Sequence, residues 1–380
     1  MTTPLFASAT QTAALIRNGT LTATEVITGH LAQIEQHNPE LNAVVTGNAE
    51  EALSQAQAAD QALQAGSTPG PLHGVPVTVK DMIETAGLRT TSGHKPFAEN
   101  IPERDAVVVA RLKAAGAIII GKTNMPAQGM DIQTDNALFG STLNPWDLSR
   151  TPGGSSGGEG AALAAGMSAL GVGTDIGGSV RIPAHYCGLV ALKPTEGLIP
   201  MEGVVLPGSV RSVRHMAAIG PMARSVDALR LALEVMSDTW GSAPPSLHKR
   251  PSQKPISQYR FALCERFGDL PVNAATQEAQ EHLVARLRDA GCEVTKASPP
   301  DFAFNDVWRT YGELFGVMAA AGLSAPLRYI LRVVGPLIAK DLIARAGARC
   351  ATASVRKYFS IMEKRDALIA ALERFIQPWD

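Results

Sequence analysis

Two short glycine- and serine-rich segments are the part of this chain best suited to chemistry. Residues 151–158 read Thr-Pro-Gly-Gly-Ser-Ser-Gly-Gly and contain Ser155, and residues 173–179 read Gly-Thr-Asp-Ile-Gly-Gly-Ser and end at Ser179. A serine hydroxyl attacks a carbonyl only when a neighbour takes its proton, and the charge that forms on the carbonyl oxygen needs preorganised N–H donors. Glycine-rich turns that carry serines can supply both, so the segments predict a serine hydrolase whose base is not a histidine.

A third candidate lies upstream, in the sequence Val-Pro-Val-Thr-Val-Lys-Asp at residues 75–81. The alternating valines predict a strand over residues 75–80, in which Thr78 and Lys80 share the face opposite the valines. Lys80 then projects from the strand end toward whatever lies across that face. A lysine at a strand end is more often simply solvated, so this position alone assigns no role to Lys80.

Two nucleotide-binding motifs compete for the same glycines. A phosphate-binding loop requires a lysine after its last glycine, but Glu159 follows Gly158 and would repel phosphate. A dinucleotide fingerprint fits residues 171–177 loosely, with three residues between its last two glycines where two are expected. A nucleotide-binding module without hydrolysis stays an alternative, which detectable binding of NAD or ATP would support.

The runner-up is the Gly-x-Ser-x-Gly nucleophile elbow, which residues 153–157 fit. This motif needs an apolar strand before it, and an acid and then a histidine after it. The candidates His215, His248 and His282 have no distinctive setting, and residues 145–152 resemble a turn rather than a strand.

The composition limits the function classes. The chain has 380 residues, 45% hydrophobic and 18% charged, with a net charge of −1, which favours a globular protein with a large core and gives no basic stripe for nucleic acid. We see neither a secretory leader nor an apolar run of about 18 residues, and we expect a cytoplasmic protein without a membrane span. The eight histidines show no metal-ligand spacing, so we expect neither metal nor cofactor.

The elements expected around the candidate residues alternate between helix and strand. We expect helices over about 23–36, 49–65, 105–115, 158–166, 179–186, 225–236 and 274–290, and strands over about 75–80, 117–121, 169–173, 259–264 and 292–295. This alternation favours an α/β fold around a mostly parallel or mixed sheet. Residues 122–150 are expected to form a long irregular segment of the kind that carries function, and the chain from about residue 304 to be largely helical.

Taken together, the motifs resemble the amidase signature family. The resemblance rests on Lys80-Asp81, Gly-Lys-Thr-Asn at 121–124, Asn-Pro-Trp at 144–146, the two glycine-serine segments, Val-Arg-Ile-Pro at 180–183 and Cys-Gly-x-x-x-Leu-Lys-Pro-Thr at 187–195. It implies a mixed, twisted central sheet with helices on both faces. It also implies a single amidase domain over residues 1–380, with a signature core at about 74–195 and a helical substrate-covering region at about 303–375.

The resemblance also implies the catalytic roles. Ser179 is expected to be the nucleophile, Ser155 the middle serine after a cis peptide bond at Gly154, and Lys80 the terminal base. Only a neutral lysine accepts a proton, and desolvation is what lowers the pKa of a lysine. Activity is therefore expected to rise toward alkaline pH.

Further residues are expected to support the site. The resemblance implies an oxyanion hole from the backbone N–H groups of Ile176, Gly177, Gly178 and Ser179. Asp175 and Arg181 are expected to form a buried structural ion pair that shapes this loop, and Ser156 to stabilise the loop by hydrogen bonds. The substrate pocket is expected at Met125, Gly129, Met130, Ile132 and the loop 200–216, although ordinary core packing equally explains the methionines.

The expected function is that of a serine-dependent amidohydrolase that cleaves C–N bonds of small hydrophobic or aryl amides through an acyl-enzyme on Ser179. One alternative is a carbamate (urethane) or ester hydrolase with the same triad. Another is the glutamine-hydrolysing subunit of a tRNA amidotransferase, which Arg181-Ile-Pro and the sequence at 193–198 disfavour. The expected partner is a small amide or carbamate, and a homodimer is compatible with the resemblance. Because family members usually continue, we expect residues 375–380 to lead into a further strand.

Overall fold

The computed structural model describes residues 4–204, 216–237, 254–300 and 302–380. Contacts within the chain separate it into two compact units, of which the first contains the described residues up to 237 and the second those from 254 on. The single domain expected over residues 1–380 stays a prediction. All the expected site residues that the structure describes belong to the first unit.

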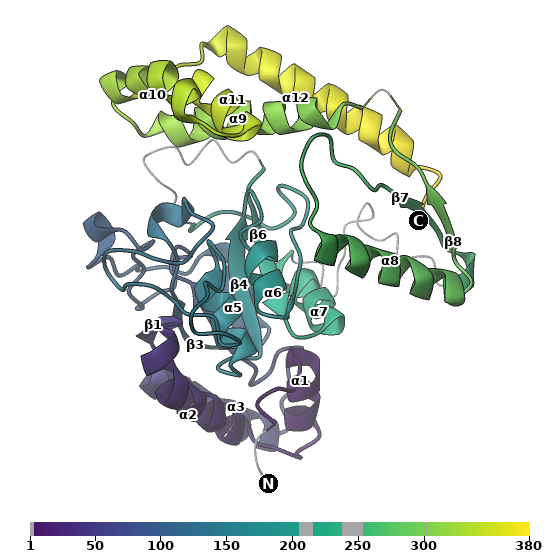
Figure 1. The fold of residues 1–380 in the computed structure, drawn as a ribbon. Coiled ribbons are helices and arrows are strands. Elements are labelled where there is room, and N and C mark those ends of the chain that lie inside the picture. Colours follow the sequence, from purple (N-terminus) through teal and green to yellow (C-terminus); the bar gives the residue numbers. More distant parts are fainter. Residues whose placement is uncertain (1–3, 205–215, 238–253, 301) are drawn as a thin grey trace. The chain divides into compact units, whose positions relative to one another are not determined.

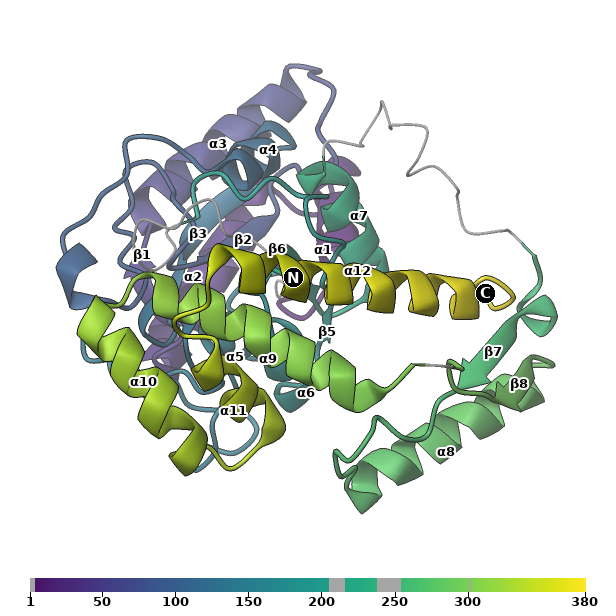
Figure 2. The same cartoon turned by 90° about the horizontal axis from the view of Figure 1, so that it is seen from above.

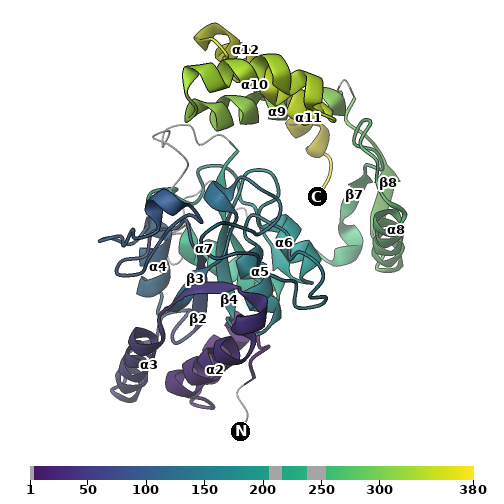
Figure 3. The same ribbon diagram turned by 60° about the vertical axis from the view of Figure 1, so that its left-hand side comes forward.

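A six-stranded sheet with the order β1-β3-β2-β4-β6-β5 forms the centre of the first unit (Figure 1). Its strands are β1 (Val44–Gly47), β2 (Pro76–Lys80), β3 (Ile118–Thr123), β4 (Leu170–Asp175), β5 (Val190–Ala191) and β6 (Ala218–Ala223). Strand β2 pairs in parallel with β3 and β4, whereas β1, β5 and β6 pair antiparallel. The sheet is therefore mixed, as expected, and β2, β3 and β4 lie side by side in its middle (Figure 3).

Helices cover both faces of this sheet because its inner strands are buried on both sides. On one face, α1 (Ala9–Arg17), α4 (Val107–Ala114) and α7 (Val226–Met236) pack in one core with Val77, Val79 and Ile119. On the other, α2 (Ala23–Leu41) and α3 (Ala49–Gln64) pack with Ile118 and Ile120. The short helices α5 (Gly157–Ala164) and α6 (Arg181–Tyr186) pack against each other, and α5 rests on β4. The predicted fold class is confirmed.

The second unit combines a small sheet with a group of helices. Strands β7 (Arg260–Leu263) and β8 (Glu293–Lys296) are parallel and are connected by α8 (Ala274–Asp289). The helices α9 (Phe304–Ala321), α10 (Ala325–Ile338), α11 (Leu342–Arg349) and α12 (Val355–Ile376) follow (Figure 2). Helices α9 and α11 approach closely at Gly316, where a Cβ would overlap the backbone of Gly347. The expected helical region is confirmed, whereas its role in covering substrate stays a prediction.

The last residues lie beside β7, and the expected lead into a further strand stays a prediction. Helix α12 continues to Ile376, and Asp380 then pairs with β7. Its N–H donates to the Arg260 carbonyl at 3.0 Å, and its carboxylate accepts from the Arg260 N–H at 2.9 Å.

Most elements of the first unit lie within a few residues of their predicted bounds, but α1, β1, β5 and β6 were not predicted. Strand β6 reads Ala-Ile-Gly-Pro-Met-Ala, which lacks the alternating β-branched residues that signal a strand. Helix α2 continues through Pro39 to Leu41, although its apolar spacing fades after residue 36.

The described residues include neither a helix suited to a membrane span nor a cluster suited to a metal ion. None of the helices there is both long and apolar enough for a membrane crossing. The same residues hold no group of three or more His, Cys, Asp and Glu side chains arranged for a metal ion.

Candidate active site

The carboxyl end of β2 places Lys80 beside the first glycine-serine segment. Lys80 Nζ donates to Ser155 Oγ at 2.6 Å and to Thr174 Oγ1 at 3.0 Å. Lys80 is 0% exposed and Ser155 is 2% exposed. Strand β4 runs parallel to β2, so Thr174 near its carboxyl end reaches the same edge of the sheet. The structure thus joins two candidates that lie far apart in the sequence and adds Thr174, which sequence analysis missed.

Burial controls the proton affinity of Lys80. It lowers the pKa of this side chain to about 7, while the negative charges of Asp175 and Glu159 act in the opposite direction. Both hydrogen-bond partners of Nζ are uncharged hydroxyls. Near pH 7, Lys80 can therefore exist as a neutral amine, which is able to accept a proton from Ser155.

The turn that carries Ser155 is fixed by the segment before it. The Gly154–Ser155 peptide bond is cis, as the resemblance implied. Thr134 Oγ1 donates to the carbonyl of Gly153 at 2.9 Å and accepts from the N–H of Gly157 at 3.1 Å. One threonine on the irregular segment therefore holds the turn on both sides of Ser155.

Ser156 connects the two glycine-serine segments. Its N–H donates to the carbonyl of Ser179 at 3.0 Å, and its buried hydroxyl donates to the carbonyl of Thr174 at 3.4 Å. These contacts tie the two segments together, and the loop-stabilising role of Ser156 stays a prediction. Within the described residues, no hydrogen bond of the Ser179 hydroxyl is present, so this backbone contact is what places Ser179 beside the Ser155 turn.

Asp175 shapes the loop that ends at Ser179. Its carboxylate accepts from the N–H groups of Gly178 at 2.8 Å and Val180 at 3.1 Å, and from two nitrogens of Arg181 at 3.0 and 2.9 Å. Burial raises the pKa of Asp175, but the bonds from Arg181 and the two N–H groups outweigh it and hold the pKa below its usual value. A charged Asp175 is thus built into the loop.

Two expectations about this loop need correction. The Gly178 N–H is engaged by Asp175, so it is not a free donor for an oxyanion. The N–H groups of Ile176, Gly177 and Ser179 have no backbone partner among the described residues. The ion pair is also only half buried, because the Arg181 side chain is 53% exposed while that of Asp175 is 0% exposed.

The expected pocket residues divide into two pairs. Met125 is fully buried, and a Cβ at Gly129 would lie 3.4 Å from Ser155 Oγ and 3.7 Å from Met125 Cε, so this pair lies near Ser155. Met130 and Ile132 are 47% and 62% exposed. Most of the loop 200–216, namely residues 205–215, lies outside the described residues.

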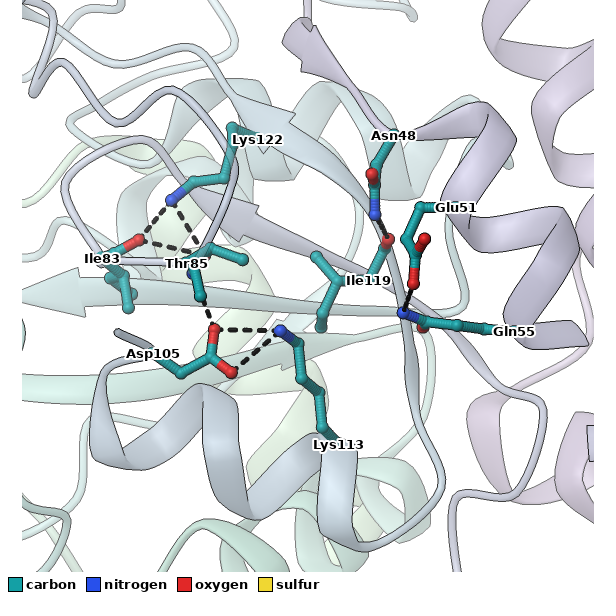
Figure 4. A network of polar contacts seen from close by, with 10 residues as sticks. Asn48, Glu51, Gln55, Ile83, Thr85, Asp105, Lys113, Ile119 and Lys122 are labelled. Carbon is teal, nitrogen blue, oxygen red and sulfur yellow. Dashed lines mark hydrogen bonds and ion pairs between the residues drawn. The ribbon is translucent and has the colours of Figure 1, made fainter. Parts of the chain in front are cut away.

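A second buried lysine, Lys122 on β3, organises the chain that follows β2 (Figure 4). Its Nζ donates to the carbonyl of Ile83 and to the hydroxyls of Thr85 at 3.1 Å and Thr90 at 3.0 Å. Burial lowers the pKa of Lys122 to about 8, and nearby Asp81 acts in the opposite direction. Three acceptors match the three protons of an ammonium, so this lysine serves as an anchor.

Sequence analysis also missed a buried carboxylate beside these lysines. Glu159, in the first turn of α5, is 0% exposed. It accepts hydrogen bonds from Thr78 Oγ1 at 2.6 Å and Thr123 Oγ1 at 2.7 Å. From the sequence, Glu159 was interpreted only as a residue that would repel phosphate at a phosphate-binding loop.

The rival motifs find little support in this geometry. A Cβ at Gly171 would overlap the Glu159 carboxylate, and one at Gly173 would lie 2.6 Å from Ser156 Oγ. The close packing of α5 on β4 thus accounts for these glycines without a nucleotide. For the nucleophile elbow, residues 145–152 contain no regular strand, and His282 is exposed on α8 of the second unit. His215 and His248 lie outside the described residues.

Comparison with known proteins agrees with this arrangement. The model of the Amidase family matches residues 25–368. The chain belongs to the amidase family. Among curated amidase-family relatives, indoleacetamide hydrolase of Bradyrhizobium diazoefficiens is 41% identical over 313 residues, which cover 81% of this chain and 59% of that protein. A glutamyl-tRNA(Gln) amidotransferase subunit of Oleidesulfovibrio alaskensis is 43% identical over 258 residues, which cover 68% of this chain and 50% of that protein.

Solved structures give the same family. A fatty acid amide hydrolase superposes with a TM-score of 0.82 at 27% identity, covering 98% of this chain and 66% of that chain. This amidase-family chain therefore spans between half and two thirds of the length of these relatives.

Proposed function

We propose that this amidase-family chain is a serine-dependent amidohydrolase that forms an acyl-enzyme on Ser179. The observation that carries the proposal is the 2.6 Å contact between Lys80 Nζ and Ser155 Oγ. Lys80 is fully buried there, and its pKa is lowered to about 7. A lysine in this state can act as a base near neutral pH, which a solvated lysine cannot do.

In the proposed acylation, neutral Lys80 takes the proton of Ser155 while Ser155 takes the proton of Ser179. Ser179 Oγ then attacks the amide carbon, and the negative charge that develops on the carbonyl oxygen faces the N–H groups of Ile176, Gly177 and Ser179. Asp175 supports these donors by holding the loop through Gly178 and Val180. Donors fixed before the reaction stabilise the oxyanion without reorganisation.

The tetrahedral intermediate collapses when the C–N bond breaks. The leaving amine receives a proton from Ser155, which is reprotonated by the Lys80 ammonium, so the lysine returns to its neutral form. Water then attacks the ester on Ser179 with the same relay as base. The sum of the two steps is amide plus water giving carboxylic acid plus amine.

The substrate we infer is a small hydrophobic or aryl amide. The contacts around Ser155 support this, because Met125 and Met82 both lie against Gly129, which is itself close to Ser155 Oγ. Thioether side chains suit adaptable apolar contact. The relative named indoleacetamide hydrolase is also named for an aryl-substituted amide.

A second candidate is the release of ammonia from glutamine within an amidotransferase complex. The specific observation in its favour is the 43% identity to an amidotransferase subunit. The reaction at Ser179 would be the same, but activity would require a partner protein. Carbamate hydrolysis would use the same triad and has no separate support. Cytoplasmic location and a homodimer stay predictions.

The test is ammonia release by the purified full chain from phenylacetamide, glutamine and a simple carbamate such as ethyl carbamate. We expect hydrolysis of phenylacetamide, lost in Ser179→Ala and in Lys80→Met. Glutaminase activity that appears only with a partner protein would support the second candidate. Hydrolysis of phenylacetamide that persists in Ser179→Ala would overturn the proposed function.

A further inference from the structure

The buried carboxylate of Glu159 lies over the three central strands of the first unit. Oε2 accepts from Thr78 on β2, and Oε1 accepts from Thr123 on β3. A Cβ at Gly171 on β4 would overlap Oε2, so the strand is bare where the carboxylate rests on it. Three neighbouring strands therefore fix the position of one charged group.

This position is adjacent to that of Lys80. Thr78 and Lys80 are two residues apart on β2 and share a face of the strand. Thr123 is the register partner of Lys80 across the parallel pair of β2 and β3. The two hydroxyls that hold Glu159 thus come from the positions next to Lys80 along the strand and across the sheet.

Packing alone does not require a carboxylate at residue 159. A glutamine could accept a hydrogen bond from one threonine and donate to the other, and an apolar residue of similar volume would avoid the cost of burying a charge. Burial accordingly raises the pKa of Glu159 to about 7, although its two threonines and the positive charges of Lys80 and Lys122 lower it. A carboxyl group that is buried at this cost, and becomes negative as the pH rises through about 7, points to an electrostatic task.

Among the described residues, two negative groups raise the pKa of Lys80, namely Asp175 from β4 and Glu159 from α5. Asp175 is already paired with the Arg181 guanidinium. Strand β3 contributes the positive charge of Lys122, which lowers the pKa of Glu159. The same charge interacts with Asp81, the neighbour of Lys80 in the chain. Glu159 is therefore the negative group near Lys80 that is held by neutral hydroxyls rather than by a hydrogen-bonded cation.

We propose that Glu159 is a positioning residue whose carboxylate form stabilises Lys80 in its protonated form, so that Lys80 can take up the proton of Ser155 during acylation and return it to the leaving amine. The inference rests on the proposed function, in which Lys80 alternates between amine and ammonium. Without this charge, a fully buried ammonium is less stable, and the proton of Ser155 has a poorer acceptor.

The direction of the effect follows from the sign of the charge. Removing a negative group makes a nearby lysine easier to deprotonate, so the pKa of Lys80 falls further in Glu159→Gln and Glu159→Met. We expect a fall of about one pH unit or more, the usual effect of one close charge. The maximal acylation rate should fall as well, because the ammonium formed in the transition state loses its stabilising neighbour.

The test is a titration of Lys80 by nuclear magnetic resonance on the full chain, with lysine labelled with carbon-13 at Cε and the signal assigned by Lys80→Met. The Gln variant can keep both threonine contacts, whereas the Met variant loses both. If the role of Glu159 were merely structural, the melting temperature would fall in the Met variant but not in the Gln variant, and the pKa of Lys80 would change in neither. Ser168→Ala is the matched control, because buried Ser168 is hydrogen-bonded to Thr78 at 2.9 Å and its substitution leaves the Glu159 carboxyl in place.

A pKa of Lys80 that falls in both uncharged variants and stays within a few tenths of a unit in the control supports the inference. An unchanged or raised pKa in the variant or variants that fold overturns it. The rate of labelling by a fluorophosphonate, measured against pH in the same proteins, tests the proposed function separately. If the pKa falls but labelling at Ser179 does not depend on Lys80, Glu159 stabilises the ammonium form of Lys80 as inferred, whereas the proposed function is overturned.

Discussion

Lys80 and Lys122 lie on neighbouring strands and are both fully buried, yet their surroundings differ. Lys122 donates to three oxygens on the chain that follows β2, one carbonyl and two hydroxyls, and Figure 4 shows its contacts with Ile83 and Thr85. Lys80 has two hydroxyl partners, Ser155 and Thr174. Burial lowers both pKa values, to about 8 for Lys122 and about 7 for Lys80.

Burial alone therefore does not make a lysine reactive. A buried ammonium with three acceptors is satisfied as a cation and acts as a structural anchor. A buried lysine with fewer acceptors, one of them a hydroxyl that can give up its proton, is suited to proton transfer. We expect the two lysines to respond differently to the same substitution.

Substitution of Lys80 should give the largest effect on chemistry. In Lys80→Met, we expect acylation to slow by about 10³-fold or more, because the relay loses its base. The free energy of unfolding should change by less than about 2 kcal/mol, since a buried polar group is exchanged for an apolar one of similar length. Fluorophosphonate labelling and urea denaturation measure the two effects. A variant that labels as fast as the wild type would break the comparison.

The same substitution at Lys122 should act mainly on stability. In Lys122→Met, the Ile83 carbonyl and the hydroxyls of Thr85 and Thr90 lose a buried donor, and Asp81 loses a nearby cation. We expect the free energy of unfolding to fall by about 3 kcal/mol. Labelling per folded molecule should fall less than tenfold. A loss of labelling as large as that in Lys80→Met, with stability unchanged, would reverse the assigned roles.

The pH dependence of acylation separates the two lysines further. Because the neutral form of Lys80 is the active one, the rate should rise about tenfold per pH unit below pH 7 and level off above it. The turning point should follow Lys80, whose pKa is lowered to about 7, and not Lys122, whose pKa is lowered to about 8. The same turning point is therefore expected in Lys122→Met, and a rate that decreases as pH rises through 7 would contradict the account.

The smallest effect is expected at the loop that carries Ser179. Arg181→Met removes a cation that is 53% exposed from buried Asp175, so stability should fall by about 1 kcal/mol or less. Labelling should slow by less than about tenfold, since Gly178 and Val180 still hold Asp175. The exposed pair of Arg150 and Asp147 gives a matched control, and Arg150→Met should change neither quantity. A larger loss in Arg181→Met would assign Arg181 a direct role.

The sequence predicted β2, β3 and β4, and it singled out the motif residues of the candidate site, because both rest on local patterns. The valine alternation at 75–79 marked β2, and the glycine-serine segments marked the turns that carry Ser155 and Ser179. The partners that set the charge of Lys80 were missed, because Thr174 lies 94 residues from it in the chain and Glu159 lies 81 residues from Thr78. Such contacts depend on strand order, which no local pattern contains.

Two further differences from the sequence-based predictions have separate physical causes. The Gly178 N–H was expected in the oxyanion hole, but the Asp175 side chain reaches three residues forward to accept from it, a local capping contact that a motif does not reveal. Strand β6 was missed because its glycine and proline weaken the strand pattern, and pairing with β4 over six residues overrides that preference.

The most direct test of the central claim is to map the adduct that a fluorophosphonate leaves on the full chain at pH 8, by intact-mass and peptide mass spectrometry. The wild type, Ser179→Ala, Lys80→Met and Lys122→Met are compared at equal amounts of folded protein. The account predicts one adduct on Ser179 that is absent in Ser179→Ala, forms at least about 10³-fold more slowly in Lys80→Met and persists in Lys122→Met. An adduct on Ser155 that survives Ser179→Ala would contradict it.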